Sequence, residues 1–415
     1  MPWREWSVTD QREELVRLAL IPGTNRSELF RRFGISRNNG YKWLKRFAAE
    51  GSEGLADRSR RPQNSPKRTS SAMEAEVLRV REKHNQAWGG RKIAWELGKA
   101  GFAHTPSPST ITEILRRHSK LERHATEHPG TYRRFERSHP NELWQMDFKG
   151  HFAMARGRCH PLTVVDDHSR YAIGVEACEN EQDATTRESL IRMFRRYGLP
   201  FVLLMDNGSP WGDPDGLTKF EVWLIRLGVR VAHGRPRHPQ TQGKDERFNR
   251  SLKAEVLNGC SYRDLPECQH AFDHWRHIYN HERPHEGIGF VTPGERYRMS
   301  SRPFPECLPE IEYGPDDFVR KVDLDGFISF KNVPIRIGKG LRRQHIALRP
   351  TATDGLFSVH FCVQQIGTIA LRDTASPACE FVDIASQPGV GSEAADAMST
   401  TPQVQQQQNS PETRI

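Results

Sequence analysis

Apolar residues recur along the chain with two different periods, and the period changes near residue 141. Before this point they are spaced three and four residues apart, which is typical of helices that bury one face. Six short helices are predicted there, over residues 13–20, 28–33, 37–47, 72–84, 90–99 and 110–118. Beyond it, short apolar runs that predict strands are mixed with longer helical stretches. The pattern therefore predicts all-α modules followed by an α/β domain.

The first three predicted helices have the layout of a helix-turn-helix domain within residues 1–50. Ser27 and Ser36 are expected to cap the second and third helices. The apolar side chains expected to form the small core are Leu29, Phe33, Ile35, Trp43, Leu44 and Phe47. The third helix suits the major groove of DNA, and its exposed polar residues are Arg37, Asn38, Asn39 and Lys42. Gly40 weakens this helix by about 1 kcal/mol, and a small bundle that contacts protein is the alternative.

A second three-helix module is predicted over residues 71–120. The linker before it, residues 51–70, is rich in Arg, Ser, Pro and Gly and has no periodicity. Its Arg58, Arg60 and Arg61 are candidates for contacts with phosphates or a minor groove. A simply solvated linker is the alternative. Residues 121–140 are charged and patternless, so we interpret them as a second linker.

Residues 141–300 are predicted to form one α/β domain. The expected elements are, in order, strands 143–152, 159–166 and 171–177, helix 185–197, strand 201–206, helix 217–227, strand 229–233 and helices 241–257 and 266–281. Three meandering strands followed by alternating helices and strands is the order of an RNase H-like fold. Short alternating runs then predict a small β-barrel over 310–373. The Gln-rich tail, 374–415, is expected to be disordered.

Charge is divided unevenly between the two halves of the chain. Residues 1–140 contain 28 Lys and Arg and 16 Asp and Glu, a net charge of +12, which leaves −3 for the remainder of a chain whose total is +9. A basic front half indicates a polyanionic partner such as nucleic acid. A solvated basic surface is the alternative.

The cysteines and the hydropathy pattern bear on location. The chain has seven cysteines, an odd number without a CxxC pair, which is typical of reduced thiols in a cytosolic protein. It contains neither a signal peptide nor an apolar run of about 18 residues. We therefore expect no membrane association and a bacterial cytoplasmic, nucleoid-associated protein.

Three carboxylates stand in distinctive settings. Asp147 lies in an apolar run that predicts a strand, and Asp206 ends another such run where Asn-Gly signals a turn. Glu246 lies one turn into the predicted helix 241–257. Two strands and one helix can bring these acids together although they are far apart in sequence.

Three converging carboxylates repel one another, and they stay ionised at neutral pH only when a divalent cation is present. Oxygen ligands suit Mg²⁺ or Mn²⁺. The set Asp147, Asp206 and Glu246 therefore predicts a site for two-metal phosphoryl transfer, with two ions that activate a hydroxyl and stabilise the leaving oxygen.

The phrases around these acids resemble the DDE transposase and retroviral-type integrase superfamily, and in particular its IS481-like group. They are WQMD at 144–147, MDNG at 205–208 and QGKDERF at 242–248. Four further segments resemble the same group, at 40–47, 51–62, 88–93 and 279–297. In that group, the segment at 88–93 belongs to a second helix-turn-helix or winged-helix-like module.

The resemblance implies an enzyme that binds the terminal inverted repeats of a transposon. Such an enzyme nicks each end to free a 3′-hydroxyl and joins it to target DNA. Asp147, Asp206 and Glu246 would be the catalytic and metal-binding residues. A homo-oligomeric synaptic complex is expected because a transposon has two ends. Lys244 and Arg247 are candidates for holding DNA phosphates beside the cut, and structural salt bridges are the alternative.

The choice of third acid has rivals. Thirty-nine residues separate Asp206 from Glu246, more than is usual in the family, and the surplus fits the loop at 212–216. Asp245 lies about 100° around the helix from Glu246 and is expected to face elsewhere. Glu255 lies more than two turns further on. The family phrase Gln-Gly-x-x-Glu aligns with Glu246 only.

Four histidines at ligand-like spacing are a second metal candidate, namely His274, His277, His281 and His285. Pro284 is expected to break the helix between the last two. The His-x-x-Arg-Pro-His phrase is also a family feature that holds no zinc. We therefore expect no metal there.

Two other classes of protein compete with a transposase. One is a helix-turn-helix DNA-binding protein, such as a repressor, whose core is catalytically silent, but the intact triad favours an active enzyme. The other is an RNase H-like nuclease without strand transfer. A nonspecific nuclease would need neither the N-terminal modules nor the C-terminal barrel.

Overall fold

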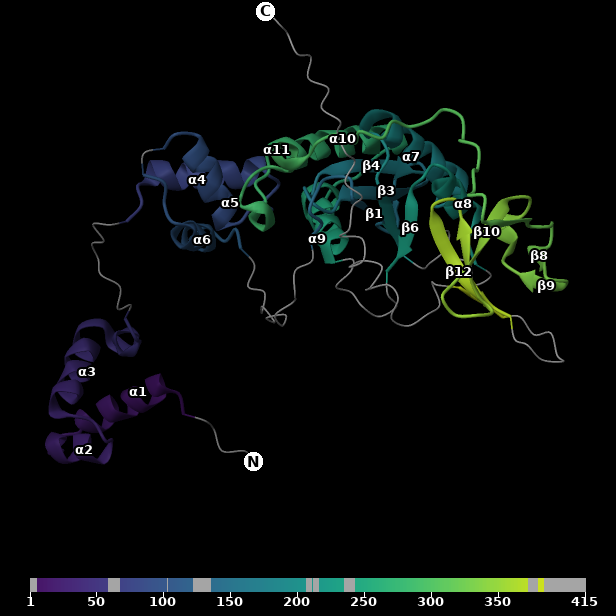
Figure 1. Cartoon of the computed structure of the whole chain (residues 1–415). Helices are drawn as coiled ribbons and strands as arrows, with labels where there is room; N and C mark the ends of the chain where they lie inside the picture. The colour runs from purple at the N-terminus through teal and green to yellow at the C-terminus, as the bar shows by residue number, and fades with distance from the viewer. Residues whose placement is uncertain are drawn as a thin grey trace, which may run out of the picture. The chain divides into compact units, whose positions relative to one another are not determined.

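The computed structural model describes residues 6–58, 68–102, 104–121, 136–206, 211, 216–234, 243–371 and 380–383. They belong to two compact units, Met1–Thr69 and Ser70–Ile415, which are described separately (Figure 1). Within the described ranges, every helix is too short or too polar to cross a membrane.

The first unit is a three-helix domain of α1 (Val8–Ala19), α2 (Arg26–Arg32) and α3 (Arg37–Glu50). As predicted, Ser36 caps α3, and its hydroxyl accepts a hydrogen bond from the backbone N–H of Asn39 at 3.3 Å. The prediction of Ser27 as the cap of α2 is wrong. Asn25 takes that role and accepts from the N–H of Glu28 at 3.2 Å, so α2 begins earlier than predicted.

Gly40 has a packing role in α3. A Cβ at this position would lie 2.5 Å from the Phe30 ring, and Phe30 is buried in the small core. Glycine therefore lets α2 and α3 approach closely, which offsets its low helix propensity. The predicted linker 51–70 begins inside this domain, because Gly51–Leu55 form a 3₁₀ turn and Leu55 is fully buried in the same core.

The second unit opens with α4 (Ser71–Lys83), α5 (Gly90–Lys99) and α6 (Pro108–Arg117). These helices match the predicted second module. Their shared core consists of Val77, Val80, Trp88, Ile93, Leu97, Ile111, Ile114 and Leu115. Ser70 and Ser107 cap α4 and α6 by accepting from backbone N–H groups.

A mixed sheet follows, built from β1 (Leu143–Phe148), β2 (Phe152–Ala153), β3 (Arg158–Asp166), β4 (Ala172–Cys178), β5 (Val202–Met205) and β6 (Arg230–His233). β1 pairs antiparallel with β3 and parallel with β5, and β5 pairs parallel with β6. β2 and β4 both pair with β3. The predicted strand 143–152 is thus two strands, and the meander-then-alternation order of an RNase H-like fold is confirmed.

Helices surround this sheet, as Figure 1 shows: α7 (Asp183–Tyr197), α8 (Lys219–Arg226), α9 (Gly243–Leu252), α10 (Leu265–His281) and the short α11 (Pro293–Arg296). α9 continues into a π-helical turn, Lys253–Leu257. A second 3₁₀ turn, Glu286–Ile288, follows α10. The apolar face of α9, Phe248 and Leu252, packs with Phe272 and Trp275 of α10.

The C-terminal strands form open sheets in the described part of the chain, so the expected small β-barrel is not confirmed. β7 (Phe318–Lys321), β10 (His345–Pro350), β11 (Leu356–Phe361), β12 (Gln364–Ala370) and β13 (Glu380–Asp383) form one antiparallel sheet, and β8 (Phe327–Phe330) and β9 (Val333–Arg336) form a hairpin. β13 contradicts the predicted disorder of the tail at 380–383, because it pairs with β12. The rest of that tail lies outside the described residues.

This C-terminal sheet is joined to the mixed sheet of β1–β6. The Gln364 side chain accepts a hydrogen bond from the backbone N–H of Val231 at 3.0 Å and donates to its carbonyl at 3.3 Å. Gln364 therefore satisfies the open edge of β6, which would otherwise be free to pair with another strand. One continuous apolar core runs from Trp144 in β1 to Ile369 in β12.

Candidate active site between β1 and α9

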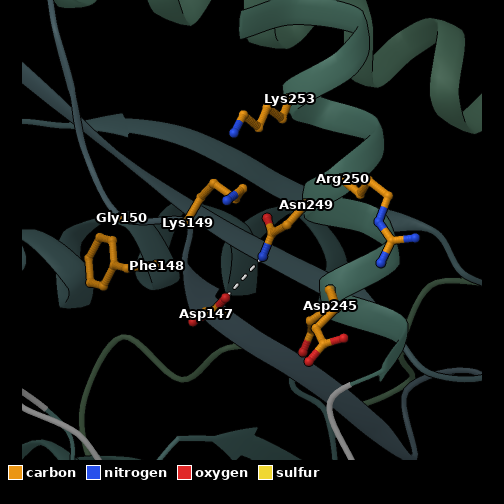
Figure 2. Close-up of a pocket in the computed structure, with 9 residues that line it drawn as sticks. Asp147, Phe148, Lys149, Gly150, Asp245, Asn249, Arg250 and Lys253 are labelled. Atoms are coloured by element: carbon orange, nitrogen blue, oxygen red, sulfur yellow. Dashed lines mark hydrogen bonds between the residues drawn. The ribbon is translucent and has the colours of Figure 1, made fainter. Parts of the chain in front are cut away.

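A pocket of about 500 Å³ opens between the end of β1 and the first turns of α9. Its lining residues are Asp147, Phe148, Lys149, Gly150, Asp245, Glu246, Asn249, Arg250 and Lys253. Figure 2 shows Asn249 of α9 reaching toward Asp147 of β1. Two of the three predicted catalytic acids, Asp147 and Glu246, therefore line one pocket.

Asp147 lies on β1 opposite Thr163 of β3. Its Oδ2 accepts a hydrogen bond from Nδ2 of Asn249 at 2.9 Å, drawn as the dashed line in Figure 2. Burial raises the pKa of Asp147 to about 6, and the carboxylate of Asp206 adds to the rise. The hydrogen bond from Asn249 and the charge of Lys149 oppose this rise in pKa without cancelling it.

Asp206 follows β5, the parallel neighbour of β1, so the two aspartates lie close enough to repel each other. The backbone carbonyl of Asp206 accepts from Nδ1 of His233 at 2.9 Å, and Nε2 of His233 contacts Glu221 at 2.7 Å. Oδ1 of Asp206 is buried without a hydrogen-bond partner among the described residues. The turn that follows, Asn207-Gly208, lies outside them.

Glu246 and Asp245 differ from the expectation. Glu246 is exposed at the mouth of the pocket, whereas Asp245 is 4% exposed and lines the same pocket. The prediction that Asp245 faces elsewhere is therefore wrong. The inner face of α9 carries Asp245 and Asn249, four residues apart, and the outer face carries Glu246 and Arg250, also four apart.

Across the described ranges, no three His, Cys, Asp or Glu side chains converge closely enough to hold a metal ion. Asp147 and Asp206 interact and Glu246 shares the pocket, but the three do not form a finished ligand set. The four histidines at ligand-like spacing, His274, His277, His281 and His285, do not form a metal-ligand set there either. Asp213 and Asp215, the two acids of the loop at 212–216, lie outside the described residues.

The donor chemistry nevertheless fits a hard divalent cation. Four oxygen atoms near Asp147 or on the acids beside it are buried and accept no hydrogen bond within the described part of the chain: Oε1 of Gln145, Oδ1 of Asp206, Oδ1 of Asp245 and Oδ1 of Asn249. Unsatisfied buried acceptors are costly. A surplus of oxygen acceptors is the ligand chemistry of Mg²⁺ and Mn²⁺.

Lys244 does not face the pocket. Its Nζ forms an ion pair with the fully buried Oδ1 of Asp167, in the turn after β3. Burial lowers the pKa of Lys244 to about 8, and the Asp167 carboxylate opposes that shift. Lys244 therefore forms the structural salt bridge that was the alternative, and its contact with a DNA phosphate stays a prediction. Arg247 is exposed.

The rival acid Glu255 also has a structural role. It is buried in the π-helical turn, where it pairs with Arg283 at 2.9 Å and accepts from Nε1 of Trp275 at 2.8 Å. Its backbone carbonyl accepts a hydrogen bond from Nδ2 of Asn85 at 2.7 Å. These partners hold Glu255 away from the pocket.

The structure adds residues that the motifs did not single out. Asn249 follows Asp245 by four positions on the inner face of α9, and Arg250 and Lys253 follow Glu246 by four and seven, which is the spacing of its outer face. Gln145 precedes Asp147 by two positions, so both point to the same side of β1. These spacings were available in the sequence once Asp147 and Glu246 had been chosen.

The predicted DNA-contacting residues of the first unit are solvent-facing. Arg37, Asn38, Asn39 and Lys42 are all exposed on α3. Lys42 lies 5.0 Å from the centre of the Trp43 ring. Arg58 pairs with Glu50 at the end of α3. Arg60 and Arg61 lie outside the described residues.

Family comparisons agree with this geometry. Residues 137–239 and 227–293 each match a family described as Integrase core domain. Residues 11–63 match a Helix-turn-helix domain, and 39–115 match a Homeodomain-like domain. These matches support a member of the DDE transposase and integrase superfamily. Residues 317–377 match the IS481 family transposase, C-terminal domain, which supports an IS481-like member.

The individual relatives share low sequence identity with this chain. The chain is 26% identical over 156 residues to a 31.7 kDa protein of insertion element IS407 from Burkholderia multivorans, covering 38% of this chain and 55% of that protein. It is 22% identical over 170 residues to the transposase for insertion sequence element IS904 from Lactococcus lactis, covering 40% and 65%. The chain thus spans about half to two thirds of the length of these relatives.

Among solved structures, the chain is similar to the HTLV-2 integrase catalytic core domain in complex with magnesium. The identity is 18%, the similarity covers 39% of this chain and 99% of that one, and the TM-score is 0.31.

Proposed function

We propose that this chain is a DDE-type DNA transposase that binds terminal inverted repeats, nicks the 3′ ends of its element and joins them to target DNA. The observation that carries the proposal is that Asp147, on β1, interacts with the carboxylate of Asp206, which directly follows the parallel neighbouring strand β5. Glu246 lines the pocket that Asp147 enters.

Asp147, Asp206 and Glu246 would hold two Mg²⁺ or Mn²⁺ ions. When bound, these ions supply the activated hydroxyl and the charge that stabilises the leaving oxygen. Asn249 orients the Asp147 carboxylate by its hydrogen bond. Arg250 and Lys253 lie on the same pocket wall as Glu246 and are exposed, so they can neutralise the phosphates of a DNA strand that enters there.

The N-terminal unit would recognise the ends of the element. The exposed face of α3, with Arg37, Asn38 and Lys42, can reach base edges in a major groove. Arg58, Arg60, Arg61 and Arg247 remain predicted contributors to salt-dependent affinity. A homo-oligomer that holds two DNA ends, and a place in the bacterial cytoplasm at the nucleoid, are parts of the same proposal.

The proposal is tested by a nicking assay on duplex DNA that carries the element's own ends, in Mg²⁺ and in EDTA. Wild type is compared with Asp147→Asn and with Asp316→Asn, the matched control, whose carboxylate is exposed and distant in sequence from the pocket. Wild type and the control should nick in Mg²⁺ only, and Asp147→Asn should bind the ends without nicking. Binding by all three without nicking in Mg²⁺ or Mn²⁺ would instead indicate a silent DNA-binding protein.

A further inference from the structure

Asp245 is an acid that the proposed mechanism does not use. Its side chain is 4% exposed, and its Oδ1 is buried without a hydrogen-bond partner among the described residues. It belongs to α9 and lines the same pocket as Asp147 (Figure 2). An ionised carboxylate in such a place is strongly destabilising unless something positive faces it.

The neighbouring side chains offset that charge only in small part. After burial itself, the carboxylates of Asp147 and Asp167 make the charged form of Asp245 less favourable, and the ammonium of Lys244 favours it by a smaller amount. Lys244 forms its ion pair with Asp167. The carboxylates near Asp245 therefore outweigh its neighbouring cation.

Two further buried atoms close to Asp147 are also unpaired acceptors. Oδ1 of Asn249, one turn along α9, and Oε1 of Gln145, on the same side of β1 as Asp147, are buried and unpartnered in the described ranges. The amide nitrogens of both residues are already used, by Asp147 and Asp167 respectively. Buried acceptors without partners therefore gather beside Asp147 in the described ranges, and a cation or a cation-bound water is the partner that would satisfy them together.

We propose that Asp245 is a fourth carboxylate of the divalent-cation site, which binds the cation, directly or through one of its water molecules, from the inner face of α9. Glu246 approaches the same pocket from the outer face. The inference rests on the proposed function, because it requires that Asp147 binds a divalent cation.

The test is Mn²⁺ binding to the full chain, measured by calorimetry and by electron paramagnetic resonance without DNA. Wild type is compared with Asp245→Asn, Asp147→Asn and the control Asp316→Asn. Asp245→Asn should weaken Mn²⁺ binding by about 10-fold or more, and it should shrink the rise in melting temperature that Mn²⁺ produces. Without metal, Asp245→Asn should melt at or above the wild-type temperature, because it removes a buried repulsion.

Failure of this inference differs from failure of the proposed function. If Asp147→Asn loses Mn²⁺ binding and Asp245→Asn binds as wild type does, Asp245 is only a buried structural acid and the inference is overturned. Unfolding of Asp245→Asn would also overturn it, because that result requires a structural partner for the carboxylate. If wild type binds Mn²⁺ no better than Asp147→Asn, the metal site of the proposed function fails as well.

Discussion

The amide of Asn249 donates a 2.9 Å hydrogen bond to Oδ2 of Asp147, and so joins α9 to β1 inside the candidate site. This bond fixes the position of the Asp147 carboxylate relative to α9, the helix that carries Glu246. The orientation of metal-binding carboxylates is commonly set by such neighbouring groups.

Replacing Asn249 with Leu should therefore reduce nicking while leaving binding to DNA ends unchanged. The side chain keeps its approximate size but loses the donor. We expect the nicking rate to fall by about 10- to 100-fold. Single-turnover nicking and a gel-shift titration measure the two properties. Equal loss of binding and nicking would show that Asn249 acts through the fold of α9 rather than through Asp147.

Lys244→Ala should destabilise the protein rather than weaken its contact with DNA. It leaves the buried Asp167 carboxylate without its cation, and breaking such a pair costs about 3 kcal/mol. Urea unfolding measures this loss. Arg250→Ala is the matched comparison, since its side chain is exposed in the pocket wall. It should keep the stability and lower the salt dependence of DNA binding. The opposite pattern would restore Lys244 as a phosphate contact.

Gly40→Ala should lower the stability of the first unit by about 1–3 kcal/mol, although alanine is the better helix former. The added Cβ would lie 2.5 Å from the Phe30 ring. Gly98→Ala in α5 is the control, because no atom lies within 4 Å of a Cβ there, and this change should stabilise by up to about 1 kcal/mol. Thermal unfolding of both variants checks the contrast. A stabilising Gly40→Ala would contradict the packing of α2 on α3.

Metal-free stability should depend on pH through Asp147. Burial and then Asp206 raise the pKa of Asp147 to about 6 in the folded protein, above about 3.9 for an unfolded aspartate. The folded state thus binds the proton more tightly, and the cost of the buried charge disappears as the pH falls from 7 through 6 toward 4. Asp147→Asn lacks this cost.

In EDTA, Asp147→Asn should therefore have a higher melting temperature than wild type at pH 7, and this difference should disappear toward pH 4. Mg²⁺ at pH 7 should reduce the difference in melting temperature by stabilising wild type alone. Melting curves across this pH range provide the measurement. A difference that stays constant with pH would contradict the raised pKa of Asp147.

Much of this architecture could be predicted from local sequence pattern. The helices of both N-terminal modules and the strand order of the core follow from apolar periodicity. The side-chain direction of Asp245 could not be predicted, because the offset of about 100° between Asp245 and Glu246 on the helix does not say which face of α9 packs toward β1. Lys244 was uncertain for a related reason: its partner Asp167 is distant in sequence. The predicted C-terminal β-barrel is not confirmed in the described residues, because barrel closure depends on long-range strand pairing, which short alternating runs do not specify.

The central claim is that Asp147, Asp206 and Glu246 together cut and join DNA. The most direct measurement is a strand-transfer assay in Mg²⁺, with pre-nicked terminal-repeat DNA and a labelled target, comparing wild type with Glu246→Gln. We predict joined product with wild type and a loss of about 100-fold or more with Glu246→Gln at unchanged end binding. Equal joining by both proteins would contradict the assignment of Glu246 as the third acid.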